Sequence, residues 1–203
     1  MLEQESPDVF TYAEVSTGSL RNKKFNQHEY LLKSSPKLVS ANSAVSKYGE
    51  SVLTTSPFHT GNSNGVISYV PSSIQEFFLQ GSTKKLVFEI KTDIVTIYTV
   101  HLPLVSMHRQ NQMLELSEKV NQCIGDVIVC GDFNIFDGVD ELGILQEKTG
   151  LKIAGEGEYT FPTSKPKRML DVFMYRFMDS ALKPNIRVLQ NDGSDHLPVM
   201  CEW

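Results

Sequence analysis

Short runs of β-branched, apolar and aromatic residues recur along the chain and predict a protein built mainly from strands. Val9–Ala13 is one run, and Lys85–Ile90 and Ile94–His101 are two more, separated by the polar residues 91–93. This spacing predicts a hairpin. The uniformly apolar run Val127–Cys130 predicts a short buried strand.

In the middle of the chain the apolar pattern changes to the period of a helix. Apolar residues recur at spacings of three and four between positions 113 and 123, with charged and amide side chains between them. This predicts an amphipathic helix over Ser106–Gln122, with Ser106 as its N-cap. A shorter helix is expected over Val139–Lys148, ended by Gly150.

The rest of the chain returns to strands, which decides the fold class. Strands are expected over Leu170–Tyr175, Ile186–Leu189 and Val199–Trp203, and a surface loop over the Ser-, Asn- and Gly-rich stretch Thr54–Gly65. A purely parallel sheet would need a helix between nearly every pair of strands. The pattern therefore predicts a mixed α/β (α+β) domain, with mostly antiparallel sheets in contact and helices outside them.

Composition fits one folded domain spanning residues 1–203. With 40% hydrophobic and 21% charged residues, a sizeable core is expected and wholesale disorder is excluded. The chain has 19 basic and 24 acidic side chains, a net charge of −5. This balance argues against a protein that coats nucleic acid through a basic face, but it is compatible with phosphate binding at one local site.

Cysteine usage and the first residues bear on location. Cys123, Cys130 and Cys201 are an odd number without metal-type spacing, and Cys130 lies in an apolar run, where it is expected to act as a small hydrophobe. No stretch approaches the roughly 18 apolar residues of a membrane helix. The start of the chain shows no signal peptide. We expect a cytoplasmic monomer without a membrane span.

Polar side chains are concentrated where the predicted strands end. An unpaired charge beside an apolar strand costs several kcal/mol, so we expect these groups to pair with each other or with a metal. Four carboxylates and an amide suit Mg²⁺ or Mn²⁺, whereas Zn²⁺ prefers Cys and His. The residues are Glu14, His101, Asp132, Asn134, Asp171, Asp195 and His196.

Each of these residues also has a purely structural interpretation. Asp132 and Asn134 are typical turn residues, His101 is compatible with a core histidine, and Glu14 with an exposed strand end. Asp195 and His196 fit a polar turn in the same way. Asp171 is the hardest to explain structurally, because the residues around it are apolar.

Six short segments follow one another in the order of a known set of motifs. They are Pro7–Val15, Thr99–Leu102, Arg109–Leu114, Val129–Asn134, Thr160–Pro162 with Arg168–Phe173, and Ser194–Val199. The Gly-Asp-Phe-Asn and Ser-Asp-His motifs within them would each be weak alone. Together they resemble the endonuclease/exonuclease/phosphatase superfamily, which includes exonuclease III and deoxyribonuclease I; Ala13 stands where that family usually has Gln.

The resemblance implies a four-layer α/β/β/α sandwich with the site at one rim of two sheets. The family normally begins with a strand that ends in an Asn of the site. Here thirteen residues precede Glu14 and none of them is Asn. The chain is therefore expected to lack that N-terminal strand, with the first helix reduced to Leu2–Ser6.

The resemblance also implies roles for the carboxylates. Glu14 matches the principal metal ligand, and Asp195 matches a carboxylate at or near the ion, which would be Mg²⁺ or alternatively Mn²⁺. Asp132 would orient or deprotonate the attacking water. Asn134 would hydrogen-bond the phosphoryl oxygens.

The remaining roles concern the phosphate. His196, paired with Asp171, would stabilise the developing charge or transfer a proton, and His101 would contact the phosphate. The basic residues Lys167 and Arg168 lie immediately upstream of Asp171. They are candidate substrate-binding residues, and a solvated basic loop is the alternative interpretation.

The function that follows is a Mg²⁺-dependent phosphoester hydrolase, with a phosphodiesterase or nuclease as the leading hypothesis. Its partner would be a phosphoester, with single-stranded or small nucleic acid favoured over long duplex DNA because of the acidic charge. A phosphomonoesterase (phosphatase) or a phospholipid-directed hydrolase on the same site is one alternative. A non-catalytic binding member of the family is the other.

Overall fold

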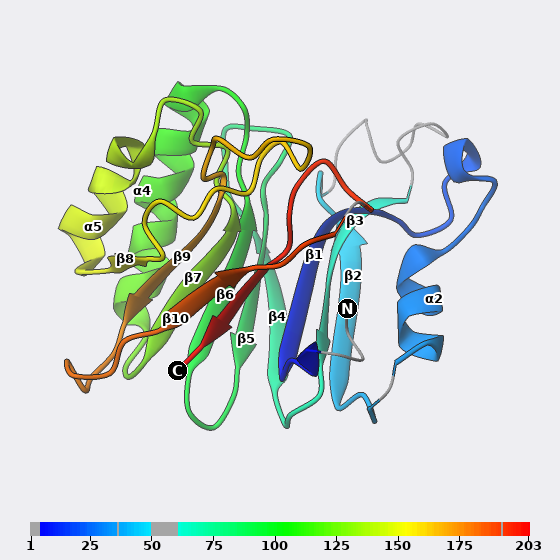
Figure 1. Ribbon diagram of the computed structural model, residues 1–203, viewed down its shortest axis with the longest axis horizontal. Helices are drawn as coiled ribbons and strands as arrows, with labels where there is room; N and C mark the ends of the chain where they lie inside the picture. Colours follow the sequence, from blue (N-terminus) through cyan, green and yellow to red (C-terminus); the bar gives the residue numbers. More distant parts are fainter. Residues whose placement is uncertain (1–4, 36, 50–60, 192) are drawn as a thin grey trace.

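A six-stranded sheet forms the centre of the molecule (Figure 1). The computed structural model describes residues 5–35, 37–49, 61–191 and 193–203. The strand order is β4-β5-β6-β7-β9-β8, with all neighbours antiparallel except the parallel pair β6–β7. The strands are β4 Ser73–Phe78, β5 Leu86–Lys91, β6 Thr96–His101, β7 Val127–Asp132, β8 Lys152–Ala154 and β9 Asp171–Arg176.

A second layer of strands faces this sheet, and it is in two pieces. A three-stranded antiparallel sheet has the order β1-β3-β2, and a separate antiparallel pair is β10–β11. These strands are β1 Val9–Ser16, β2 Ala41–Ser46, β3 Asn62–Ser68, β10 Asn185–Val188 and β11 Val199–Glu202. The expected mixed α/β fold with two main sheets is therefore present, and the division of the second layer is an addition to it.

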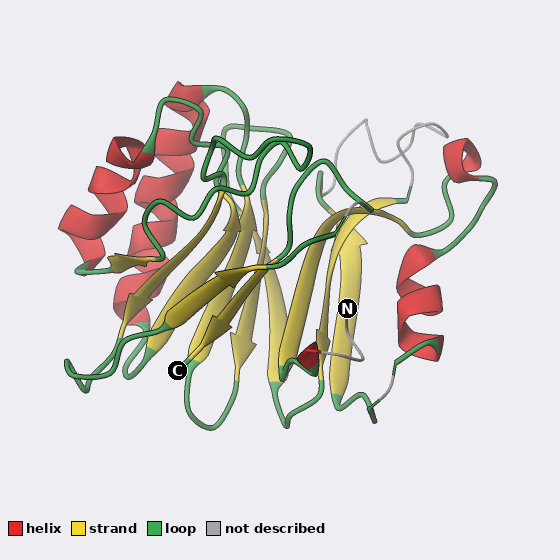
Figure 2. Ribbon diagram, in the orientation of Figure 1, coloured by secondary structure: helices red, strands yellow, loops and turns green. Residues whose placement is uncertain are grey.

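Helices lie on the outside of both layers (Figure 2). The helix α4 (Ser106–Gln122) connects the parallel strands β6 and β7, and α5 (Gly143–Thr149) lies beside it on the same face of the six-stranded sheet. The helix α2 (Gln27–Lys33) lies next to β1 on the opposite side of the molecule. Within the described residues, no helix has the length and apolarity needed to cross a membrane.

Two apolar layers hold the sheets and helices together. Val127 and Val129 of β7 belong to the core shared with α4 and α5, whereas Ile128 and Cys130 belong to the core between the two layers of strands. Both faces of β7 are thus covered, which explains its unbroken apolar sequence. The prediction that Cys130 is buried in a strand is confirmed.

Most of the predicted elements are present. The hairpin of β5 and β6, the strand β7 and the full extent of α4 are confirmed. The assignment of Ser106 as N-cap is wrong, because Val105 holds that position and the Ser106 hydroxyl donates to Glu141 instead. The predicted second helix begins as a 3₁₀ turn, η2 (Val139–Leu142), continues as α5, and ends at Gly150 with φ 72°.

One predicted loop is partly a strand. The stretch Thr54–Gly65 was expected to be a surface loop, but β3 begins at Asn62, and residues 54–60 lie outside the described part of the chain. The Ser-, Asn- and Gly-rich start of β3 has weak strand propensity. It is nevertheless paired on both sides, by β1 and β2, and this tertiary pairing determines its conformation. Most of the short helix expected at Leu2–Ser6 also lies outside the described residues.

Candidate functional site

Three of the predicted site residues form one row across neighbouring strands. His101 ends β6 and pairs in register with Asp132 at the end of β7, which pairs in register with Asp171 at the start of β9. Adjacent strands lie about 4.8 Å apart, so side chains in such a row converge. The alternation along β7 puts Asp132 on the face that carries Ile128 and Cys130, toward the second layer of strands.

Gly131 makes the close approach of β6 and β7 at this row feasible. Its φ is 130°, and a Cβ atom at this position would lie 2.1 Å from the Val100 carbonyl oxygen. Only glycine fits such a position without moving the backbone. The glycine before Asp132 is therefore a geometric requirement of the row.

Glu14 reaches the site from the other layer of strands. It lies at an irregularity of β1, where the pairing with β3 shifts between Tyr12 and Val15, and its φ is 57°. A non-glycine residue in this left-handed region is strained, and such strain is concentrated at functional sites. The Glu14 backbone N–H donates to Asn64 Oδ1 at 3.2 Å, which supports this conformation.

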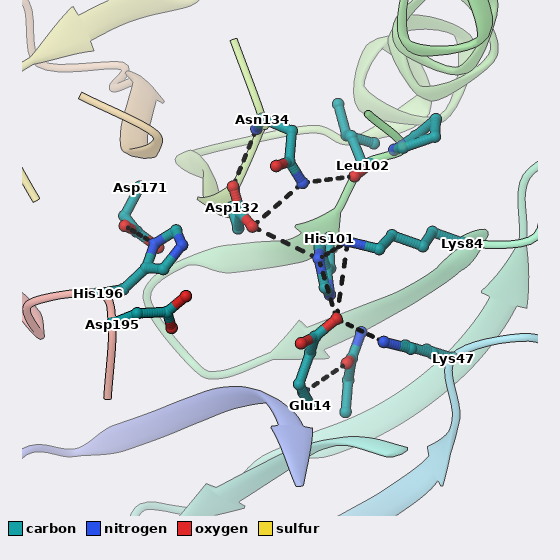
Figure 3. A network of polar contacts seen from close by, with 12 residues as sticks. Glu14, Lys47, Lys84, His101, Leu102, Asp132, Asn134, Asp171, Asp195 and His196 are labelled. Carbon is teal, nitrogen blue, oxygen red and sulfur yellow. Dashed lines mark hydrogen bonds and ion pairs between the residues drawn. The ribbon is translucent and has the colours of Figure 1, made fainter. Parts of the chain in front are cut away.

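The Glu14 carboxylate is surrounded by nitrogen atoms (Figure 3). Lys47 Nζ lies 2.5 Å from Oε1, and Lys84 Nζ lies 3.6 Å from the same oxygen. His101 Nε2 is 3.8 Å away. Partial burial alone would raise the pKa of Glu14, but the Lys47 hydrogen bond and the nearby positive charges lower it to about 2. Glu14 is therefore ionised across the physiological range.

His101 connects the two sides of the site. It is buried, and its Nε2 lies 2.5 Å from Lys84 Nζ and 3.4 Å from Asp132 Oδ2. Burial, reinforced by the charge of Lys84, lowers the pKa of His101 to about 3. The imidazole is neutral at neutral pH and can accept a hydrogen bond from the Lys84 ammonium.

Asn134 holds Asp132 in place. Its backbone N–H donates to Asp132 Oδ1 at 2.9 Å, and its side-chain amide donates to Asp132 Oδ2 at 3.1 Å and to the Leu102 carbonyl at 2.8 Å. Burial, followed by the negative charge of Asp171, raises the pKa of Asp132 to about 6. Asp132 thus titrates close to neutral pH, as a general base requires.

His196 and Asp171 form a second pair on the far side of Asp132. His196 Nδ1 lies 2.7 Å from Asp171 Oδ2. Burial would lower the pKa of His196, but the hydrogen bond and charge of Asp171 outweigh it and raise the pKa. The Phe161 ring lies against the imidazole, with centroids 4.9 Å apart, and limits its orientation.

The donor atoms of Asp132, Asp171 and His196 fit a divalent metal. One atom from each lies within 4.8 Å of the other two. Two carboxylates and an imidazole match Mn²⁺ and, through their oxygens, Mg²⁺. Glu14 offers a further carboxylate, whose side chain is 54% exposed.

The other predicted residues lie at the edge of this arrangement. Asp195 is exposed and points toward the space between His196 and Glu14 (Figure 3). Lys167 and Arg168 are exposed, and the Arg168 guanidinium lies 4.9 Å from the Phe136 ring. Neither takes part in a salt bridge of the site within the described residues.

Sequence reasoning missed three residues of the site. Lys47 and Lys84 contact Glu14, and Asn64 supports its backbone. All three lie in segments without a recognisable motif. The only signal was the position of Lys84 just before the apolar run of β5, and that signal does not distinguish it from its neighbour Lys85.

Comparisons with known proteins agree with the motif resemblance at the level of the fold. No family model and no curated protein sequence matches the chain. A solved endonuclease/exonuclease/phosphatase family protein from Leptotrichia buccalis matches with a TM-score of 0.68 at 17% identity, covering 99% of this chain and 88% of that one. The human Nocturnin catalytic domain gives 0.70 at 18%, covering 98% and 82%.

A third structure, a mannosyl-6-phosphatase from Bacteroides thetaiotaomicron, matches with a TM-score of 0.71 at 14% identity and covers 100% of this chain and 87% of its own. One of these three neighbours is named as an endonuclease/exonuclease/phosphatase family protein, and all three matches cover 98% or more of this chain. The chain shares the fold of these structures, which agrees with the fold that the resemblance of its motifs predicted.

Proposed function

We propose that the protein is a divalent-metal-dependent phosphoester hydrolase that acts on phosphodiesters. The observation that carries the proposal is the meeting of Asp132 with the Asp171–His196 pair at one end of the six-stranded sheet. This arrangement combines a base that titrates near neutral pH with an imidazole whose protonated form a carboxylate stabilises, in a fold shared with a structure named a phosphatase.

Asp132 would activate the attacking water. Its two oxygens are fixed by Asn134, so an ionised Asp132 presents a defined direction to a water molecule. The water oxygen bonds to phosphorus, its proton passes to Asp132, and the bond from phosphorus to the leaving oxygen breaks. The Asn134 amide is used to position Asp132 in this arrangement, which makes Asn134 a positioning residue.

His196 would stabilise the charge that develops on the phosphate. Asp171 accepts from Nδ1, so Nε2 of the imidazolium is the nitrogen that can face a phosphoryl or leaving oxygen. A fixed cation aimed at developing negative charge is among the largest contributions to catalysis. His196 can also supply the proton that the leaving oxygen takes up.

The carboxylates of Glu14, Asp132 and Asp171 are the groups that would hold the metal, because a His196 imidazolium has no lone pair to offer it. Mg²⁺ or Mn²⁺ bound there would neutralise a phosphate oxygen and the leaving group. Lys47 and Lys84 add positive charge on the Glu14 side. This charge favours an anionic substrate at a site whose own carboxylates would otherwise repel it.

The proposed substrate class is a small or single-stranded phosphodiester, since the chain is acidic overall. Two related enzymes define the alternatives. One structural neighbour is named a mannosyl-6-phosphatase, which favours a phosphomonoester, and another is named a sphingomyelinase C, which favours a phospholipid. We further propose a cytoplasmic location and a monomeric state, as expected from the sequence.

Turnover of two chromogenic esters separates these possibilities. The purified chain should hydrolyse bis-p-nitrophenyl phosphate faster than p-nitrophenyl phosphate with Mg²⁺ or Mn²⁺, and EDTA should stop the reaction. The variants Asp132→Ala and His196→Ala are the controls, each expected to lose about 10²-fold or more. Preference for the monoester would replace the phosphodiesterase proposal by a phosphatase. Metal-independent turnover, or no turnover together with no metal binding, would reject the hydrolase proposal.

A further inference from the structure

Lys47 is a buried lysine whose charge is balanced inside the site. It follows β2 and is 4% exposed, and its Nζ lies 2.5 Å from Glu14 Oε1. A buried ammonium group costs several kcal/mol unless an opposite charge pairs with it. Within the described part of the chain, Glu14 is the acidic residue that forms a salt bridge with Lys47. The negative charge of Glu14 is thus already balanced by the positive charge of Lys47.

Lys84 adds a second cation to the same oxygen. Its Nζ lies 3.6 Å from Glu14 Oε1, and its side chain is 19% exposed. The Nζ is held in this place by His101 Nε2, 2.5 Å away. Glu14 and the two lysines together carry a formal charge of +1, so a divalent cation at Glu14 meets a net repulsion.

The other carboxylates of the site are in a different electrostatic situation. Within the residues that the structure describes, no lysine or arginine forms a salt bridge with Asp132 or Asp171, whose nearest partners are the imidazoles of His101 and His196. Negative charge is therefore less completely balanced on the Asp132 side than on the Glu14 side, although both sides face the same space (Figure 3).

We propose that Lys47, assisted by Lys84, is a built-in counter-ion that weakens divalent-cation binding at Glu14. A cation reaches this carboxylate only by sharing it with Lys47 or by displacing the ammonium group. The inference rests on the proposed metal site, and it is independent of the substrate. It makes Lys47 a residue that sets metal affinity, which none of the sequence motifs indicates.

Direct Mn²⁺ titration by calorimetry on the purified full chain tests the proposal. Lys47→Met keeps much of the side-chain volume and removes the charge, so it should bind Mn²⁺ about tenfold or more tightly than the wild type. Lys84→Met should tighten binding less, because its charge is farther from Glu14. Lys85→Met is the matched control, because the Lys85 ammonium lies over the Phe78 ring; its affinity should equal that of the wild type.

The double variant Lys47→Met/Glu14→Gln assigns the effect to Glu14, since it should lose the gain of Lys47→Met. Equal or weaker Mn²⁺ binding by Lys47→Met would overturn the inference, as would a gain that persists without Glu14. If Lys47→Met does not fold, Lys84→Met alone decides, and an unchanged affinity in that variant counts against the proposal.

The ester assay distinguishes a failure of this inference from a failure of the proposed function. Metal-dependent turnover with an affinity unaffected by Lys47→Met would overturn only the role of Lys47. Tighter Mn²⁺ binding by Lys47→Met without turnover of any ester would support that role and reject the hydrolase. No Mn²⁺ binding by any variant would overturn both.

Discussion

Asp132 is the residue in which the needs of folding and of catalysis conflict most clearly. The proposed reaction needs an ionised carboxylate, and the fold raises its pKa to about 6 by burying it and by placing Asp171 beside it. In the metal-free protein the ionised form of Asp132 is therefore less favourable than it is in the unfolded chain. A bound cation would relieve this conflict, because it stabilises both neighbouring carboxylates in their charged state.

The conflict predicts that Asp132→Asn is more stable than the wild type at high pH. Folded Asp132 titrates near 6, above the usual value near 4, so the wild type loses stability as the pH rises through this interval. Below about pH 4 the carboxyl is neutral in both the folded and unfolded states, and the penalty is absent. We expect Asp132→Asn to gain about 1–3 kcal/mol at pH 8 in metal-free buffer and to have almost no activity.

Urea unfolding at pH 8 and pH 4 measures this difference. The gain should be present at pH 8 and should shrink at pH 4. A variant that is less stable than the wild type at pH 8 would show that the carboxylate of Asp132 stabilises the fold, contrary to the expected sign.

Among the elements, the segment that connects β6 to α4 fixes the part of the site next to His101. Arg109 of α4 is 1% exposed and donates to Glu141 Oε2 at 2.5 Å and 3.1 Å, from Nη2 and Nε. Its Nη1 donates to the carbonyls of Pro103 and Leu104. Arg109 therefore ties the chain just after His101 both to the helix and to η2.

Replacing Arg109 by Met should destabilise the protein by about 3–5 kcal/mol, because Glu141 would remain as a nearly buried charge without its partner. Chemical denaturation is the measurement. The double variant Arg109→Met/Glu141→Met should regain most of the loss, since it removes both charges. A single variant as stable as the wild type would mean that water or another group satisfies Glu141.

The Asp132 side of the candidate site could be predicted from sequence, because its residues lie at the ends of strands with strong apolar patterns. Asp132 ends such a strand and Asp171 begins another, so the strands themselves locate the carboxylates. Lys47 follows β2, whose sequence of Ala, Asn, Ser and Val has no clear period and was not predicted as a strand. That strand is formed through its pairing with β3, and this information is not local.

At the scale of the whole molecule, a bound metal should behave as a ligand that stabilises the fold. Mn²⁺ at about 100 times its Kd is expected to add about 2.7 kcal/mol to the free energy of unfolding, and chelation should remove it. Glu14→Gln should reduce this gain. Asp140→Asn, at an exposed carboxylate on η2, should leave it unchanged.

Thermal unfolding with Mn²⁺ and with EDTA gives the comparison. A rise in Tm of the same size in Glu14→Gln and in the wild type would exclude Glu14 from the metal site. It would leave the carboxylates of Asp132 and Asp171 as the ligands that remain to be tested.

The two layers of strands contribute different halves of the site, with Glu14 and Lys47 on or beside the three-stranded sheet and Asp132 and Asp171 on the six-stranded one. The proposed site consequently lies at the interface between two parts of the molecule that can open separately. Partial, sub-global opening of the smaller sheet would take Glu14 away while the row across β6, β7 and β9 stays intact. Ester hydrolysis would then be lost at a lower denaturant concentration than the far-UV circular dichroism of the helices. Amide hydrogen exchange would be faster in β1 than in β7.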